Sequence, residues 1–360
     1  MTNSEKLTSM IAEKFFLPQY IYTDVYAKTG KQDNEFCDCL LEFDSVYIVI
    51  QIKERGEKTT ISDEEWFEKK VVKKAKKQLK DTMAFFADTT NTIFSKAGKL
   101  TIDRSKTIIP VIVFLNPNLS SYERLVRSES LGQVINIFSY ADFETMLQTV
   151  VLPYDIVFYL QYRQAFNEVD SGKPIVDAVD DDITILFRPT SEKDYSQMFL
   201  ARYYYQEIVV HNLSEDHIRF YNDLVSQINT SCKNERCPFI SGFLRVDYKR
   251  AATISRKWLE LMDVARVDGF VFPFTFTIDD REYMFMVKPK RIPPMQFELY
   301  LERILIYHRY KHSCTTAHMI FISHIADEQF SIEVVNIDLT TLSRYDELVE
   351  ETIDIMESSK

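Results

Sequence analysis

The chain has 360 residues, of which 46% are hydrophobic and 27% charged, an ordinary composition for a globular protein with room for one large domain or two. A formal net charge of −11 argues against a broadly basic nucleic-acid-binding protein, and 7 glycines leave no glycine-rich phosphate loop for an ATPase. The apolar runs fall short of the ~20 residues that span a membrane, and the N-terminus lacks the pattern of a secretory signal. The 5 scattered cysteines indicate reduced thiols, so we expect a cytoplasmic protein without membrane contact.

The first predicted elements are a helix and a β-hairpin. Residues 4–17 have the spacing of a helix with one apolar face, and Pro18 ends it. Residues 35–55 follow as two short strands, EFCDCLLEF and VYIVIQIKE. The Asp44-Ser45 pair between them is typical of a tight turn, because both side chains bond to the backbone there.

Three polar side chains interrupt the apolar hairpin. Side chains alternate between the two faces of a strand, so Gln51 and Lys53 share a face, and the turn brings Asp38 of the first strand close to them. A lysine at the end of an apolar strand is costly unless it is paired or used. Carboxylate and amide oxygens are hard ligands suited to Mg²⁺, and a nearby lysine can orient water or stabilise developing charge. The pattern predicts a metal-dependent phosphodiesterase site.

At these residues the sequence resembles the PD-(D/E)xK nuclease superfamily, which has the restriction-endonuclease-like fold. The family pattern is an acid, a hairpin turn, then an acid or Gln, any residue and Lys. Asp38, Gln51 and Lys53 match it, and the Gln resembles the QxK variant of Mrr-type nucleases. Cys37 stands where the pattern has Pro. The resemblance covers roughly residues 1–150.

The resemblance implies cleavage of nucleic acid, usually DNA, with Mg²⁺ (or Mn²⁺) as cofactor, and it suggests a setting in microbial genome defence. Asp38, Gln51 and the backbone carbonyl of Ile52 would bind the metal, and Lys53 would position the attacking water. A helix before the hairpin often supplies a further acid in this family, which makes Glu13 a candidate catalytic residue. The alternative for Glu13 is a solvated surface glutamate.

A strongly basic helix is predicted after the hairpin. Ser62 and Glu65 form a capping box, and the helix is expected to run to about Asp88. Seven of the twelve residues 69–80 are lysines. The candidate phosphate-binding residues are Lys69, Lys70, Lys73, Lys74 and Lys77. A solvated face paired with the preceding glutamates explains the same lysines equally well. Gln78 lies on the opposite, inward stripe, either as a catalytic residue or as a buried hydrogen-bonding amide.

The remaining pattern predicts an α/β protein with two domains. Strands at 106–115 and 134–138 and a helix at 140–150 complete a restriction-endonuclease-like mixed sheet flanked by helices. We therefore expect a nuclease-like domain at 1–168. We also expect a linker at 169–182, followed by a second α/β domain at 183–360 that recognises the target or a partner.

The second domain repeats the order of hairpin, helix and strands. Lys288 takes the place of Lys53, Met286 that of Gln51, and Asp268 is a possible relic of the first acid. A degenerate copy of the first domain and a chance recurrence of a common order both explain this. A zinc site is conceivable at His308, His312, Cys314 and His318. The reason to consider it is that His308 and His312 are one helical turn apart, but packing and surface roles are the preferred interpretation.

Three hypotheses follow. The first is a metal-dependent nuclease that acts on DNA. The second is a catalytically inactive adaptor or assembly subunit on the same fold, which the Gln in place of an acid and the sequence pI of 5.2 favour. The third is a basic-helix scaffold that binds DNA without cutting it. A protein partner or homo-oligomer would form through the second domain.

Overall fold

The computed structural model divides into two compact units, Met1–Leu213 and Ser214–Lys360. It describes residues 17–29, 32–43, 45–166, 176–180, 183–186, 191–210, 215–233, 238–278, 281–326, 329–342 and 344–358. The division lies after Leu213 and not in the 169–182 segment, because the helix at Glu192–Tyr205 packs on the helices before it. Part of the expected linker is instead a strand, Val176–Asp180, paired with Ile183–Leu186.

The first unit is built on a mixed sheet in the order β5-β4-β1-β2-β3-β6-β8-β7. The strands are β1 (Ile21–Thr29), β2 (Gln32–Glu42), β3 (Val46–Glu54), β4 (Thr92–Ser95), β5 (Gly98–Leu100), β6 (Thr107–Leu115), β7 (Leu125–Ser128) and β8 (Gln133–Ser139). Strands β1 to β3 form an antiparallel meander, whereas β3, β6 and β8 are parallel. The predicted α/β class with a mixed sheet is confirmed.

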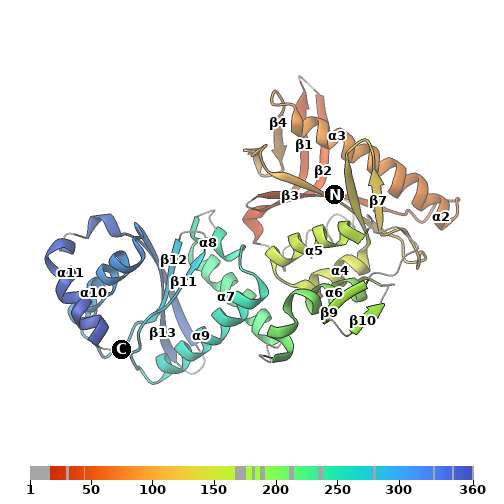
Figure 1. The fold of residues 1–360 in the computed structure, drawn as a ribbon. Helices are drawn as coiled ribbons and strands as arrows, with labels where there is room; N and C mark the ends of the chain where they lie inside the picture. The colour runs from red at the N-terminus through yellow and green to blue at the C-terminus, as the bar shows by residue number, and fades with distance from the viewer. Residues whose placement is uncertain are drawn as a thin grey trace. The chain divides into compact units, whose positions relative to one another are not determined.

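Helices cover both faces of this sheet (Figure 1). One face carries a continuous helix made of α2 (Asp63–Trp66), the π-helical η2 (Phe67–Ala75) and α3 (Lys76–Ala87). The other carries α4 (Tyr140–Val150) and α5 (Pro153–Phe166), with α6 (Glu192–Tyr205) packed on them and continued by η3 (Gln206–Val210). The short η1 (Pro18–Tyr20) precedes β1, and β9 (Val176–Asp180) pairs with β10 (Ile183–Leu186).

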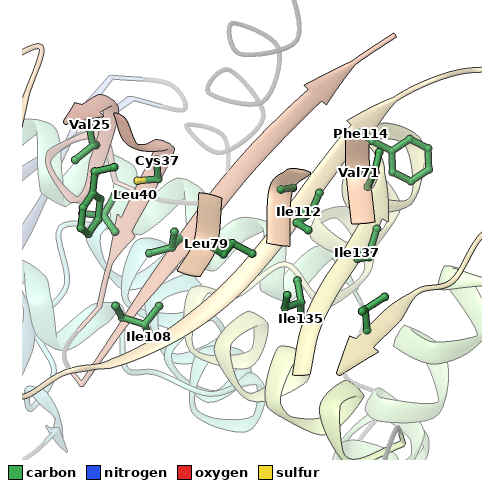
Figure 2. Packing of buried hydrophobic residues seen from close by; sticks show 14 of the residues in the cluster. Val25, Cys37, Leu40, Val71, Leu79, Ile108, Ile112, Phe114, Ile135 and Ile137 are labelled. Atoms are coloured by element: carbon green, nitrogen blue, oxygen red, sulfur yellow. The ribbon is translucent and has the colours of Figure 1, made fainter. Parts of the chain in front are cut away.

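The α2–α3 helix begins where the capping box predicts. The Ser62 hydroxyl accepts a hydrogen bond from the Glu65 N–H, which satisfies one of the unpaired donors of the first turn. Its inward stripe, which includes Val71 and Leu79, packs against β3 and β6 in the core that Figure 2 shows. This packing places the helix over the face of the sheet that carries the polar residues of the hairpin.

The second unit has a four-stranded sheet in the order β11-β12-β13-β14, in which β12 and β13 are parallel and the other neighbours antiparallel. Its strands are β11 (Phe274–Ile278), β12 (Arg281–Val287), β13 (Thr316–Ala326) and β14 (Gln329–Asp338). Its helices are α7 (Glu215–Ser231), α8 (Pro238–Phe243), α9 (Tyr248–Arg266), α10 (Pro294–His312), η4 (Leu339–Thr341) and α11 (Tyr345–Ser358). Helices α7 and α9 pack on one face, and α10 packs on the other (Figure 1).

The sequence predicted most of the long elements and missed the short ones and β1. Strands β1, β4, β5 and β7 were not predicted, because three of them are only 3 or 4 residues long and β1 is half exposed along much of its length. In the described part of the chain, the helices are all too short or too polar to cross a bilayer. The four described cysteines are free thiols.

Candidate functional site: a cation-holding pocket at the β2–β3 hairpin

The site begins where the backbone pairing between β2 and β3 ends and a side chain of β2 bonds to the backbone of β3 instead. The two strands pair from Glu42–Tyr47 to Cys39–Ile50. One step further, the Asp38 carboxylate oxygen Oδ2 accepts a hydrogen bond from the backbone N–H of Ile52 at 2.6 Å. A side chain thus occupies the position of a backbone partner, and this fixes the carboxylate beside the end of β3.

Three oxygen atoms surround the ammonium group of Lys53. Its Nζ lies 2.8 Å from the Ile52 carbonyl oxygen, 3.4 Å from Gln51 Oε1 and 3.8 Å from Asp38 Oδ2. The Lys53 and Asp38 side chains are only 13% and 12% exposed. The structure therefore brings together the three side chains that the hairpin pattern placed near one another, and the pocket already holds a positive charge.

The donor set suits a small hard cation. A carboxylate, an amide oxygen and a backbone carbonyl are all oxygen ligands of the kind that Mg²⁺ binds, with water completing its octahedron. The same three oxygens contact the Lys53 ammonium, whose flexible stem allows it to move aside. Among these three ligands of the described residues, Asp38 carries the full negative charge, and more ligand charge strengthens the binding of a divalent ion. The chemistry of the described residues fits Mg²⁺ or Mn²⁺.

The position of Gln51 is fixed by a second group of contacts. Its side chain is fully buried, and Nε2 donates to the Phe36 carbonyl oxygen at 3.3 Å, which turns Oε1 toward Lys53. The Thr82 hydroxyl of α3 donates to the same carbonyl. Thr82 follows Gln78 by one helical turn on the same inward stripe, and its contact with the Phe36 carbonyl depends on the packing of α3 on β2.

Gln78 does lie on the inner side of the helix, but it is not part of the pocket. Its Nε2 donates to Glu35 Oε1 at 3.0 Å, and its Oε1 has no hydrogen-bond partner among the described residues. The contact with Glu35 is of the kind that the hydrogen-bonding alternative predicts, and a catalytic role for Gln78 stays a prediction. Glu13 lies outside the described residues.

Some lysines of the basic helix fit the solvated-face interpretation, and others are free to fit the phosphate-binding one. Lys69 forms an ion pair with Glu65, and Lys73 lies 3.4 Å from Glu68, as the solvated-face interpretation predicts. Lys70, Lys74 and Lys77 are exposed and form no ion pair within the described ranges. All five lysines stay candidates for phosphate binding, because exposed ion pairs of this kind are weak, and Lys70, Lys74 and Lys77 are the three without an ion pair among the described residues.

The cysteines beside Asp38 are part of the core. Cys37 and Cys39 are buried, and burial, with Cys39 and Asp38 adding to it, raises the pKa of the Cys37 thiol well above its usual value. A protonated thiol is a poor nucleophile and a poor metal ligand. Cys37 therefore packs against the core and does not extend the donor set.

The corresponding position in the second unit has no such pocket. Met286 is fully buried in an apolar cluster, and the Lys288 ammonium contacts Glu333 at 2.8 Å on the surface. The Asp268 carboxylate accepts hydrogen bonds from the backbone N–H groups of Lys290 and Arg291. The possible relic of the first acid is thus a loop-capping residue outside the hairpin.

Comparison with known proteins adds no identification. No protein-family model, no curated protein and no solved structure matches this chain. The site is therefore interpreted from its own geometry.

Proposed function

We propose that the first unit is a metal-dependent nuclease that hydrolyses phosphodiester bonds of DNA. The observation that carries the proposal is the convergence of Asp38 Oδ2, Gln51 Oε1 and the Ile52 carbonyl on one buried positive charge. Three oxygen donors that converge in this way, next to a lysine, provide both a cation site and a charged group for catalysis. The resemblance to the PD-(D/E)xK superfamily supports the same conclusion.

Each residue of the pocket has a role in this proposal. Asp38, Gln51 and the Ile52 carbonyl would hold Mg²⁺, which when bound would act as a Lewis acid on the scissile phosphate. Lys53 would leave the oxygens and place its ammonium beside the attacking water and the phosphate. There it would orient the water and stabilise the negative charge that develops on the phosphate oxygens.

DNA would bind to one basic surface and not to the whole protein, since the chain carries a net charge of −11. Lys70, Lys74 and Lys77 lie exposed on the helix that covers the face of the sheet bearing the pocket. Such side chains release counterions when they contact phosphates, so binding through them weakens steeply with salt.

The test is cleavage of supercoiled plasmid by the full chain with Mg²⁺ or Mn²⁺. Lys53→Ala is expected to lower the rate about 100-fold or more, the size of effect seen when one charge-stabilising donor is removed. Lys288→Ala is the matched control, because it removes a lysine at the corresponding place in the second unit. Cleavage that persists in Lys53→Ala, or that falls equally in Lys288→Ala, contradicts the proposal.

The 3.8 Å approach of Lys53 Nζ to Asp38 Oδ2 favours one alternative, a catalytically inactive protein in which Lys53 permanently neutralises Asp38. In that case the ion pair is structural, and neither Mg²⁺ nor Mn²⁺ binds. Calorimetric titration of the wild type with Mn²⁺ separates the two, because the nuclease requires a binding isotherm that Asp38→Asn removes.

A further inference from the structure

A second group of side chains that can bind a metal ion lies in the second unit. It consists of Glu282 at the start of β12 and His308 and His312 in the last turns of α10. One ligand atom from each lies within 4.8 Å of the others. The two histidines are one helical turn apart, which places them on the same face, and their rings stack at 4.7 Å.

The distances within this group are too long for direct hydrogen bonds. His312 Nδ1 is 3.6 Å and His308 Nδ1 is 3.9 Å from the Glu282 carboxylate. Zinc binds imidazole nitrogen at about 2.0–2.1 Å, so tetrahedral ligands lie roughly 3.3 Å apart. The two His–Glu distances exceed that spacing by about 0.3 and 0.6 Å, and because the three ligand atoms lie within 4.8 Å of one another, side-chain shifts of at most about 1.5 Å would bring them to it.

One buried member of the group, His308, has a ring nitrogen without a hydrogen-bond partner among the described residues. His308 is 5% exposed, and its Nδ1 has no hydrogen-bond partner in the described part of the chain. An unpaired buried nitrogen is costly, and a metal ion removes that cost. Glu282 is 4% exposed, and its Oε1 accepts a hydrogen bond from the Thr277 hydroxyl at 2.7 Å, the outer-shell contact that orients a ligating carboxylate. His312 is 36% exposed and leaves an entry path from solvent.

We propose that Glu282, His308 and His312 form a Zn²⁺ site that joins the end of α10 to the start of β12. Two imidazoles and one carboxylate are a known zinc donor set, with water in the fourth position. The imidazoles also distinguish this site from the all-oxygen pocket at Asp38, since Mg²⁺ prefers oxygen ligands.

The test uses the full chain, stripped of metal and titrated with Zn²⁺ by calorimetry in the presence of excess Mg²⁺. The wild type is expected to bind one Zn²⁺, and His312→Ala, at the half-exposed position, is expected to weaken binding at least tenfold. His324→Ala, a half-buried histidine outside the group in the same unit, and Asp38→Asn in the first unit are expected to leave Zn²⁺ affinity unchanged.

A second measurement covers variants that change the fold. Co²⁺ bound to the wild type is expected to give the visible absorption of a low-coordinate site with nitrogen and oxygen ligands, and Glu282→Gln is expected to change that spectrum. Zn²⁺ is expected to raise the Tm of both proteins, and to raise that of Glu282→Gln by less than that of the wild type. No Zn²⁺ binding by the wild type overturns the proposal. Affinity that His312→Ala leaves unchanged also overturns it.

Discussion

The two units place a hairpin, a crossing helix and a parallel strand in the same topological order, but their polar residues lie at opposite ends of the central strand. In the first unit, β2 and β3 are followed by α2–α3 and β6, and Gln51 and Lys53 stand near the end of β3. In the second unit, β11 and β12 are followed by α10 and β13, and Glu282 stands at the start of β12. Met286 fills the place of Gln51.

The difference shows what a polar group under a helix requires. The middle of each strand is apolar, because no partner is available there for a charge or an amide. Polar side chains are accepted where the strand meets a neighbouring carbonyl, carboxylate or histidine. Gln51 has the Phe36 carbonyl and Lys53, whereas Glu282 has Thr277 and two histidines. The partners, and not the strand alone, decide where a site can form.

The largest expected effect is a difference in plasmid cleavage between substitutions of Asp38 and of Asp268. Asp38→Asn keeps an acceptor for the Ile52 N–H but removes the carboxylate charge beside Lys53. We expect plasmid cleavage to fall about 100-fold or more, since charge at the metal and phosphate dominates this chemistry. Asp268→Asn, in the second unit, is expected to leave the rate unchanged. Equal rates for wild type and Asp38→Asn would remove the distinction between the two hairpins.

The next effect in size is the loss of stability expected when Met286 is replaced by the glutamine that the first unit has at the corresponding position. Met286→Gln puts an amide into the apolar cluster around Met284 and Ile304 and is expected to lower the free energy of unfolding by about 1–3 kcal/mol. The chain has 2 tryptophans, one in each unit, so Trp258 fluorescence in a Trp66→Phe background follows the second unit alone. Unchanged stability, or a gain of nuclease activity, would show that the apolar position is not what disables this hairpin.

A smaller effect concerns metal affinity in the first unit. Gln51→Glu adds a second negative charge to the oxygen set, and more ligand charge strengthens the binding of a divalent cation. We expect the Mg²⁺ concentration for half-maximal cleavage to fall about tenfold, which corresponds to about 1.4 kcal/mol. Cleavage that is lost in Gln51→Glu would mean that the amide has a role that a carboxylate cannot fill.

The smallest effect concerns the support of Gln51. Thr82→Val removes the hydroxyl that bonds to the Phe36 carbonyl and is expected to cost about 1 kcal/mol of unfolding free energy. Trp66 fluorescence in a Trp258→Phe background reports on the first unit. Thr145→Val in α4 of the same unit, whose hydroxyl donates to the Ala141 carbonyl one turn earlier in its own helix, is the matched control and is expected to change little. Equal losses in both variants would show that the carbonyl contact is not specific.

The sequence was informative where function follows from strand alternation and short spacing. The alternation of β3 and the position of the turn predicted that Asp38, Gln51 and Lys53 lie together, and the capping box predicted the start of α2. Contacts that depend on how a helix packs on a distant strand could not be read in this way. The Thr82 contact with Phe36 requires the packing of α3 on β2.

The same limit applies to the second unit. The spacing of His308 and His312 is visible in the sequence, but Glu282 comes from a different element, and only the packing of α10 against β12 brings it to them. His318, grouped with them by proximity in the sequence, instead contacts Asn336 on the neighbouring strand at 2.7 Å. Register and face decided which histidines share a site.

The most direct test of the central claim is diffraction from crystals of the full chain soaked in Mn²⁺. If the β2–β3 hairpin is a metal site, an anomalous peak appears about 2.0–2.2 Å from oxygens of Asp38, Gln51 and Ile52, and the Lys53 ammonium has moved away from them. If the pocket is a structural ion pair, no peak appears there at saturating Mn²⁺ and Lys53 keeps its three oxygen contacts, which would contradict the nuclease proposal.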